Sequence, residues 1–209
     1  MNTEERVEVN RAGWRAIGKH LASPQLNYTH FSGALEQFVK ALPPGGRVLD
    51  LGCGAGAVAK PLASCGLQVV GVDFADEMVI AARSVVPEGT FLQRSMTDID
   101  FVAEFDGVVA SYSLLCLTPG EFRIVARKIA RALKPHGWCF VALNEPHPGE
   151  DQDGTAVSEI AGQQVYCRAY QESEVREAFK DFQIVHVARQ VIRSEAYGDE
   201  KSIVFLMHA

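Results

Sequence analysis

The sequence has few of the features that mark membrane, secreted or nucleic-acid-binding proteins. No apolar run approaches the roughly 18–20 residues that a membrane span needs. The stretch from Met1 to Arg15 is polar and charged, unlike a secretory signal peptide. No Lys/Arg cluster is present, and the net charge of −6 disfavours nucleic acid as the main partner. These absences predict a cytoplasmic protein with no membrane and no nucleic-acid partner.

The cysteines do not form a recognisable framework. There are five, at positions 53, 65, 116, 139 and 167, and no two of them form a C-x-x-C pair. An odd number without such pairs predicts reduced thiols, and argues against a disulfide scaffold or a zinc site. Cys53 lies within a glycine-rich segment, where we interpret it as a tolerated small residue in preference to a reactive thiol.

The composition fits one globular domain. The chain has 209 residues, of which 47% are apolar, and its mean hydropathy is +0.01. That length allows a single domain with a sizeable core. No internal repeat or low-complexity tract interrupts the chain.

The most informative segment is Val48 to Gly56, which reads VLDLGCGAG. An apolar run ends near an acid, and three glycines then alternate before a helical pattern begins. This order predicts a strand, a tight turn and a helix, in which the glycines allow positive φ and close approach of a ligand to the backbone. Asp50 at the strand tip favours a ligand that carries an ammonium or sulfonium group over an anionic pyrophosphate.

The glycine spacing alone leaves a second interpretation open. Gly52, Gly54 and Ala57 also satisfy the G-x-G-x-x-G/A dinucleotide fingerprint, so an NAD(P)-dependent reductase remains an alternative. A non-catalytic cofactor-binding module of the same fold is another. Asp50 and the third glycine, Gly56, favour the cationic cofactor over the dinucleotide.

Asp73 ends the next apolar run, 17 residues after Gly56. In a doubly wound fold this is the position of the acid that binds a ribose diol, since one carboxylate accepts from two neighbouring hydroxyls. The alternative is that Asp73 caps the helix expected from Ala75. Because the glycine turn lies one unit upstream, the ribose role is favoured.

Strand and helix patterns alternate through the centre of the chain, which predicts an α/β fold with a mostly parallel, doubly wound Rossmann-like sheet. We expect seven strands, the last two forming a C-terminal antiparallel hairpin that turns around Gly198-Asp199. Residues 145–163 are rich in Gly, Pro, Asp and Glu and predict a long loop. The expected strands are 47–51, 68–73, 90–94, 105–111, 137–144, 182–193 and 202–208, with a short one at 165–170. The expected helices are 4–21, 31–41, 56–65, 75–85, 119–133 and 171–179.

These motifs together resemble the class I S-adenosylmethionine-dependent methyltransferases. Val48 to Gly56 is similar to their first motif and Val69 to Asp73 to their second. Phe105 to Ser111 is similar to the strand-four motif, and Leu133 to Trp138 to the turn before strand five. The C-terminal half is also similar to small bacterial methyltransferases of the tellurite-resistance type.

The resemblance implies a cofactor, S-adenosylmethionine, which would leave as S-adenosylhomocysteine, and a role for individual residues. Asp50 would stand beside the cofactor ammonium, Asp73 would hold both ribose hydroxyls, and Phe74 would pack on the adenine. Ser111 would flank the methionine portion, with Tyr112 next to the transferring methyl. The implied cofactor residues are Asp50, Gly52, Cys53, Gly54, Asp73, Phe74, Met78, Ser95, Met96, Thr97 and Ser111.

The resemblance also implies methyl transfer by in-line displacement, in which a base is needed only where the acceptor carries a proton. The chain reads Ala-Ser-Tyr-Ser after the fourth strand, without the N-P-P-Y motif of relatives that methylate amino groups of bases or glutamine. Asp106 begins that strand, so we expect no metal. A small-molecule acceptor is the remaining class. Catalytic candidates are His147, Glu145 and Tyr112; substrate candidates are Trp14, Tyr28, His30, Asn144, Tyr166 and Arg168.

Three of these candidates have ordinary alternatives. Core packing is as plausible as a pocket wall for Trp14 and Tyr166, and a surface ion pair is favoured over substrate binding for Arg168. We expect one methyltransferase domain over 1–209. In it, 1–42 would be a helical lid, 43–144 the cofactor-binding core, and 145–209 a substrate loop and hairpin.

Overall fold

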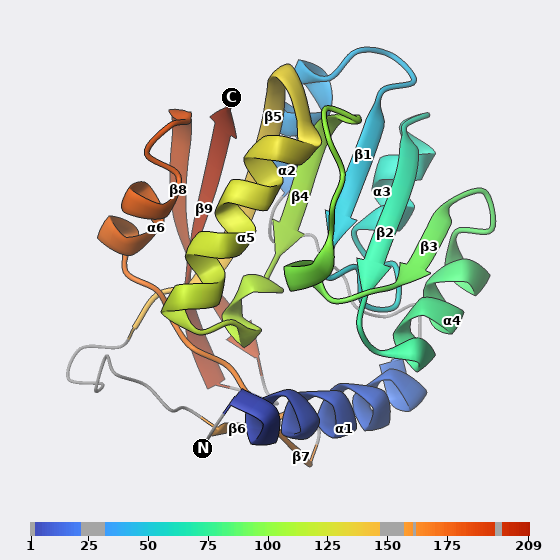
Figure 1. The fold of residues 1–209 in the computed structure, drawn as a ribbon, viewed down its shortest axis with the longest axis vertical. Helices are drawn as coiled ribbons and strands as arrows, with labels where there is room; N and C mark the ends of the chain where they lie inside the picture. Colours follow the sequence, from blue (N-terminus) through green and yellow to red (C-terminus); the bar gives the residue numbers. More distant parts are fainter. Residues whose placement is uncertain (1–2, 22–31, 147–156, 161, 195–197) are drawn as a thin grey trace.

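The computed structural model describes residues 3–21, 32–146, 157–160, 162–194 and 198–209. Its centre is a seven-stranded sheet in the order β3-β2-β1-β4-β5-β9-β8, and β6 and β7 form a separate two-stranded sheet (Figure 1). The predicted α/β class and seven-stranded, mostly parallel sheet are confirmed. The strands are β1 (Arg47–Leu51), β2 (Gln68–Asp73), β3 (Thr90–Gln93), β4 (Phe105–Ser111), β5 (Leu133–Asn144), β6 (Val157–Ile160), β7 (Gln163–Tyr166), β8 (Gln183–Ser194) and β9 (Gly198–His208).

The strand order fixes where a ligand can bind. β1 pairs in parallel with β2 on one side and with β4 on the other, so the chain changes direction across the sheet at β1. In open α/β sheets, ligands bind at such a switch point, outside the carboxyl ends of the strands. The glycine turn follows β1 at this end, and Ser111 ends β4 beside it.

Helices cover both faces of the sheet, as near-continuously apolar parallel strands require. α5 and α6 pack on one face through Phe122, Ile129 and Val175, while α2, α3 and α4 pack on the other. The helices are α1 (Thr3–Leu21), α2 (Ser32–Ala41), α3 (Ala59–Ser64), α4 (Asp76–Val85), α5 (Pro119–Ala132) and α6 (Glu172–Ala178), with short 3₁₀ turns η2 (Met96–Asp98) and η3 (Leu114–Cys116). No helix in the described ranges is both long and apolar enough to span a bilayer.

The two N-terminal helices, expected together as a lid, have different positions. α2 is a core helix, since its Phe38 is fully buried and packs with Phe140 on the sheet. Gly107 of β4 allows this contact, because a Cβ there would lie 2.6 Å from the Phe38 ring. α1 instead crosses the carboxyl ends of the strands (Figure 1).

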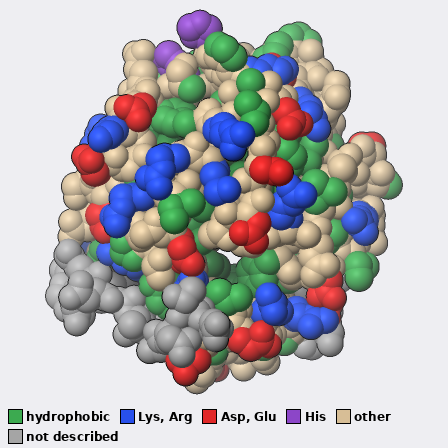
Figure 2. All heavy atoms as spheres, in the orientation of Figure 1, with side chains coloured by type: hydrophobic (Ala, Val, Ile, Leu, Met, Phe, Trp, Pro, Cys, Tyr) green, Lys and Arg blue, Asp and Glu red, His purple; other side chains and the backbone are tan. Residues whose placement is uncertain are grey.

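Polar contacts hold α1 across this end of the sheet. Arg6 donates to the Cys116 carbonyl and pairs with Glu121. Asn10 accepts a hydrogen bond from the Tyr166 backbone N–H at 2.6 Å. Arg15 pairs with Asp76 and Glu77 at the start of α4. The surface is hollowed just above α1 (Figure 2), so this helix forms one wall of an opening.

Most boundaries shift by one to three residues from the sequence prediction, such as α3, which begins at Ala59 and not at 56. Three segments differ more. The expected 145–163 loop contains a strand, residues 157–160, which pairs in antiparallel fashion with residues 163–166. Gly162, between the two strands, has φ +74°. Strand β7 ends at Tyr166, short of the expected 170, and packs under α1, where a Cβ at Gly13 would lie 2.5 Å from the Gln164 carbonyl. This hairpin therefore depends on a contact distant in sequence, which its polar composition conceals.

The other two differences concern β5 and β9. β5 begins at Leu133, which pairs with Phe105 before a register shift, so the "L-K-P-H-G" segment is part of the strand. β9 begins at Gly198, and Asp199 pairs with Arg193. These two residues were expected to form the hairpin turn, but they are strand residues, and the connection lies within 195–197, outside the described residues.

Helix α5 has a complete capping box, which gives a stability prediction. Thr118 Oγ1 accepts from the Glu121 N–H at 3.3 Å, and Glu121 accepts from the Thr118 N–H at 2.8 Å. Thr118→Ala should lower the free energy of unfolding by about 1 kcal/mol in urea titrations. Ser84→Ala is the matched control, because that hydroxyl bonds only within its own helix turn. Equal losses in both variants would contradict the capping role.

Candidate functional site

The glycine turn after β1 is held against the end of β2. The Gly52 and Cys53 N–H groups donate to the Val72 carbonyl at 2.8 and 3.0 Å. Gly52 has φ +74°, and a Cβ there would lie 2.3 Å from Ser113 Cβ. Glycine is therefore required at this position both by backbone conformation and by close packing.

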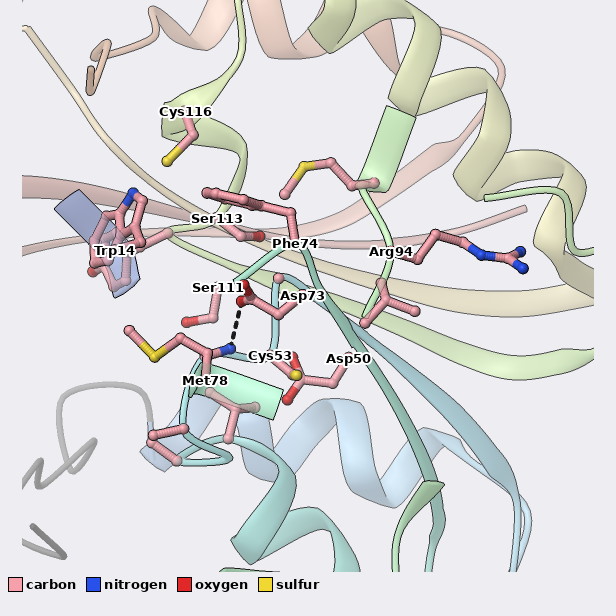
Figure 3. A pocket seen from close by; sticks show the side chains of 18 residues that line it. Trp14, Asp50, Cys53, Asp73, Phe74, Met78, Arg94, Ser111, Ser113 and Cys116 are labelled. Carbon is pink, nitrogen blue, oxygen red and sulfur yellow. Dashed lines mark hydrogen bonds between the residues drawn. The ribbon is translucent and has the colours of Figure 1, made fainter. Parts of the chain in front are cut away.

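A pocket opens beside this turn, between the strand ends and α1 (Figure 3). Its empty volume is about 910 Å³, including the space at its open mouth. The lining residues are Trp14, Asp50, Gly52, Cys53, Gly54, Ala55, Ala57, Val58, Val72, Asp73, Phe74, Met78, Arg94, Met96, Ser111, Tyr112, Ser113 and Cys116.

The carboxylate of Asp73 connects the glycine turn to the start of α4. Its Oδ2 accepts from the Gly54 N–H and its Oδ1 from the Ala75 N–H, both at 2.9 Å. The cap residue of α4 is Ala75, so Asp73 supports this helix start without being its N-cap. Burial raises the pKa of Asp73 above its ordinary value, although these backbone donors oppose the shift. Each oxygen keeps further acceptor capacity, so two ligand hydroxyls can still be bound.

Asp50 is the least compensated charge in the pocket. Its residue is 1% exposed, and its Oδ2 has no hydrogen-bond partner among the described residues. Burial, together with the negative charge of Asp73, raises the pKa of Asp50 to about 7. A buried carboxylate is costly unless it is paired. The pocket therefore provides an anionic acceptor to which no described residue supplies the cation.

Two more buried polar atoms in the same pocket lack partners among the described residues. They are the hydroxyl oxygen of Ser111 and the indole nitrogen of Trp14. Buried polar groups are normally satisfied, so unpaired ones gathered in one cavity indicate a ligand site. Trp14, for which core packing was the alternative, is thus a pocket residue.

The apolar cofactor candidates also lie here. Phe74, Met78 and Met96 all line the pocket, on β2, α4 and η2. Cys53 lines it as well, but its sulfur points toward β2, where a Cβ on Gly71 would lie 2.9 Å from it. Burial raises the pKa of the Cys53 thiol well above its ordinary value, so the thiol stays protonated. This geometry agrees with the interpretation of Cys53 as a small residue.

Tyr112 lies in the pocket in a strained conformation. Its φ is +54°, which is uncommon for an aromatic residue and marks positions held by their surroundings. Its N–H donates to the Ala142 carbonyl at 2.9 Å, and its hydroxyl lies 2.5 Å from Ser202 Oγ. These contacts fix the ring at the end of β4.

Two cofactor candidates do not line the pocket. Ser95 is the N-cap of η2: its hydroxyl accepts from the Thr97 N–H and lies 2.8 Å from the Thr97 hydroxyl. Neither residue is among those that line the pocket. Asp98, in the same turn, is exposed and accepts from the Thr97 hydroxyl at 3.2 Å.

Four substrate or catalytic candidates lie outside the pocket lining. Glu145 pairs with Arg189 at 2.9 Å, and the Asn144 carbonyl accepts from the Tyr170 N–H. Tyr166 is buried below α1. Arg168 forms an ion pair with Glu174 at 2.8 Å, as its ordinary interpretation expected, but the pair is partly buried and not at the surface. The remaining candidates, His147, Tyr28 and His30, lie outside the described residues.

Several lining residues were not singled out from the sequence. Ser113 could have been found, since it follows Ser111 by two positions at the same strand end. Arg94 follows β3 directly, yet its guanidinium pairs with Asp100. Cys116 carries no sequence signal, because its place depends on how η3 folds back toward α1. The small residues Ala55, Ala57, Val58 and Val72 complete the group.

Comparisons with known proteins agree with this geometry. The methyltransferase-domain family matches residues 48–137. An uncharacterised methyltransferase of Synechocystis sp. is 37% identical over 108 residues, which are 51% of either chain. A ubiquinone biosynthesis O-methyltransferase of Xanthomonas campestris is 36% identical over 104 residues, 47% of this chain and 43% of that protein. The chain thus spans about half the length of these curated relatives.

Residues 48–137 thus match a methyltransferase domain. Solved structures of S-adenosylmethionine-dependent methyltransferases share the fold. A methyltransferase of Methanosarcina mazei aligns with a TM-score of 0.72 at 18% identity, covering 81% of this chain and 94% of that one. The 1,6-didemethyltoxoflavin-N1-methyltransferase of Burkholderia thailandensis aligns with a TM-score of 0.75 at 19% identity, covering 100% and 90%.

The pocket of the methyltransferase domain fits the cofactor of its family. S-Adenosylmethionine carries an ammonium group, and Asp50 offers the unpaired carboxylate oxygen that such a cation requires. Gly54 exposes its backbone, since nothing lies within 4 Å of where its Cβ would be. Asp73, Phe74 and Met96 line the same pocket.

Metal ligands are not gathered in the described part of the methyltransferase domain. No group of three or more His, Cys, Asp or Glu residues lies together in the described ranges. Asp106, whose position at the start of β4 suggested that it does not bind a metal, accepts from the Arg47 N–H at 2.8 Å and pairs with Lys134 at 2.9 Å. Its carboxylate is thus a structural link between β4 and its neighbours.

Proposed function

We propose that this protein transfers the methyl group of S-adenosylmethionine to a small organic acceptor, by in-line displacement and without a metal. The observation that carries this proposal is the unpaired, buried Asp50 carboxylate beside the glycine turn. A dinucleotide would bring an anionic pyrophosphate against this carboxylate. The following helix α3 has six residues and begins only at Ala59, so it offers little dipole compensation for an anion.

Different residues of the pocket would bind different parts of the cofactor. Asp50 would pair with the cofactor ammonium, and Ser111 with the methionine portion. Asp73 would bind the ribose hydroxyls, while Phe74, Met78 and Met96 would surround the adenine. When bound, the cofactor supplies a methyl group already activated on a sulfonium. What remains for this chain is to hold the acceptor in line with that methyl and to exclude water, for which α1 is well placed.

A small acceptor is supported by two similar proteins. The Burkholderia enzyme was crystallised with 1,6-didemethyltoxoflavin and S-adenosylhomocysteine bound, and the Xanthomonas relative is an O-methyltransferase of ubiquinone biosynthesis. We propose that residues 43–144 hold the cofactor, and that α1 and residues 145–209 shape the acceptor side. Tyr112 and His147 remain candidates for a base, whereas Glu145 is already paired with Arg189.

Calorimetric titration tests this proposal directly. S-Adenosylmethionine and S-adenosylhomocysteine should each bind at a single site, and NADH should neither bind nor displace them. Incubation with labelled cofactor and a panel of small phenols, amines and thiols should then give a labelled product. Absence of cofactor binding at millimolar concentration, or displacement by NADH, would contradict the proposed function.

Asp73→Ala should weaken S-adenosylhomocysteine binding by about 1–3 kcal/mol, because it removes charge-assisted hydrogen bonds to the ribose. The loss would be read as an increase in Kd by calorimetry. Asp98→Ala is the matched control, since it removes an exposed carboxylate near the same loop. Thermal unfolding should show that both variants fold. An unchanged Kd in Asp73→Ala would mean that the ribose lies elsewhere.

A further inference from the structure

One side of the pocket carries no charge among its described residues. Trp14 of α1 and Cys116 of η3 lie on the side opposite Asp50 (Figure 3), and Cys167 packs behind them. We call Trp14, Cys116 and Cys167 the thiol end of the pocket. The glycine turn, Asp50 and Asp73 form the other end, and Phe74 and Met78 lie between the two ends, in the same apolar cluster as Trp14.

The indole of Trp14 supplies the only directional group of the thiol end. Its Nε1 is buried and donates to no oxygen or nitrogen among the described residues; its one polar neighbour is the Cys116 thiol, which is a weak acceptor. An indole N–H can only donate, so it needs an acceptor atom to compensate for its burial. Ser111 and Asp50, the other unpartnered polar groups of the pocket, lie at the strand ends next to the glycine turn. Trp14 is therefore the donor left for a second molecule.

The thiols of Cys116 and Cys167 make this end of the pocket weakly polar. The Arg168 N–H donates to the Leu115 carbonyl at 2.8 Å, which brings Cys167 beside Cys116. Hydrogen bonding with Cys167, together with burial, raises the pKa of Cys116 well above its ordinary value. The thiol therefore stays protonated at neutral pH and provides no negative charge.

The cations nearest to the thiol end are already paired. Arg6 donates to the Cys116 carbonyl and forms an ion pair with Glu121, and Arg168 pairs with Glu174. Neither arginine lines the pocket. A carboxylate on a molecule entering this end would be buried without a counter-ion among the described residues, which is strongly unfavourable.

We propose that the thiol end receives the methyl acceptor, that this acceptor is a planar molecule without a negative charge, and that Trp14 Nε1 donates to its carbonyl, hydroxyl or ring nitrogen. This inference rests on the proposed function, because it assigns the second substrate of the same pocket. The indole face offers the flat apolar surface that a ring requires. The Arg15 pairs with α4 hold this part of α1 in place, which makes Trp14 a specificity-determining residue.

The chain itself offers a reporter for this test. It contains two tryptophans, and Trp138 packs against His208 with ring centroids 5.3 Å apart, outside the pocket lining. In a Trp138→Phe variant, all tryptophan emission therefore comes from Trp14. This protein, saturated with S-adenosylhomocysteine, would be titrated with matched pairs of dihydroxybenzoic acids and their methyl esters. Calorimetry gives Kd, and corrected emission shows whether the ligand reaches Trp14.

The neutral ester of a pair should bind at least tenfold more tightly than its acid at pH 8, and should change Trp14 emission. Trp14→Phe, made with Trp138 retained, keeps the ring and loses the donor. It should raise the Kd of the ester about tenfold while changing that of S-adenosylhomocysteine less than twofold. Equal or tighter binding of the acids would overturn the proposal, as would the failure of every ester to bind cofactor-loaded protein.

The Trp14→Phe result also separates the two proposals. A rise in the Kd of S-adenosylhomocysteine similar to that of the ester would assign Trp14 to the cofactor and overturn the acceptor subsite, while leaving the methyltransferase function intact. Failure of the unmodified protein to bind S-adenosylhomocysteine would overturn the proposed function first. Thermal unfolding of Trp14→Phe, expected near that of the parent, excludes a folding defect as the cause.

Discussion

Asp50→Asn is expected to stabilise the free protein and, at the same time, to weaken cofactor binding. The carboxylate is buried with one oxygen unpaired, and burial with the nearby charge of Asp73 raises its pKa to about 7. Asparagine has nearly the same shape and carries no charge. The substitution should therefore relieve the desolvation cost in the free protein and remove the partner of the cofactor ammonium.

The pH dependence of this stabilisation follows from the proton balance of Asp50. Below about pH 4 the carboxyl is protonated in both the folded and the unfolded chain, so it contributes nothing. Between about pH 4 and 7 the unfolded chain has released a proton that the folded state still holds, so stability falls as pH rises. Above about pH 7 the penalty is constant, at up to about 4 kcal/mol for three pKa units.

Urea unfolding at several pH values measures this effect. At pH 8, Asp50→Asn should be about 2–4 kcal/mol more stable than the parent, and at pH 4 the two should be nearly equal. Asp106→Asn is the control of opposite sign. Partial burial would raise the pKa of Asp106, but the bonds from Arg47 and Lys134 outweigh it and lower the pKa. Its loss should destabilise the protein, and a destabilised Asp50→Asn would contradict the assignment of Asp50.

Cofactor binding should change in the opposite direction. An ionised Asp50 forms a charged hydrogen bond worth about 1.5–3 kcal/mol, so Asp50→Asn should raise the Kd of S-adenosylhomocysteine roughly tenfold or more at pH 8. In the parent, Kd should fall as pH rises through about 7, because the carboxylate becomes ionised. Asp50→Asn should lose this dependence. Asp50 would thus lower the stability of the free protein and raise its affinity for the cofactor. This trade-off is expected of residues kept for function and not for stability.

Gly52→Ala is expected to destabilise the protein and to abolish cofactor binding. A non-glycine residue at φ +74° costs about 1–2 kcal/mol. The added Cβ would also lie 2.3 Å from Ser113 Cβ and 3.3 Å from Met96 Cε, and such overpacking costs about 1–3 kcal/mol more. The expected loss of unfolding free energy is thus about 2–5 kcal/mol. The displaced Ser113 and Met96 should raise the cofactor Kd at least hundredfold.

Variants at two other glycines separate the cost of the backbone conformation from the effect on the ligand site. Gly66 has φ +80° and open space around its Cβ position, so Gly66→Ala should show the conformational cost alone, with Kd unchanged. Gly54 has φ +50° and likewise nothing within 4 Å, but it lines the pocket. Gly54→Ala should match Gly66→Ala in stability and yet weaken binding, because its methyl group occupies space meant for the ligand. Equal cofactor affinity in all three variants would contradict the placement of the ligand over this turn.

The sequence was sufficient for the sheet and for the cofactor half of the pocket because both depend on local signals. Continuous apolar strands, glycines with positive φ and an acid at a strand end each leave a mark within a few residues. β1, β2 and β4 were therefore predicted with their observed bounds, and Asp50 and Asp73 could be assigned to one site before the strands were placed side by side.

The other side of the pocket depends on contacts that are distant in sequence. Cys116 reaches it because η3 folds back below α1, and Cys167 joins it through a hairpin whose strands are polar and short. Arg168 and Glu145 look available in the sequence, but their partners Glu174 and Arg189 become apparent only in the folded chain. The role of α2 as a core helix likewise depends on the close approach that Gly107 permits.

A crystal structure of the protein with S-adenosylhomocysteine would decide whether the pocket is built for a cationic nucleoside thioether. We expect the ligand ammonium within hydrogen-bonding distance of Asp50 Oδ2, the ribose hydroxyls on Asp73, and the thioether facing Tyr112. Electron density for the ligand elsewhere, or a nucleotide diphosphate bound over Gly52 and Gly54 in its place, would contradict it.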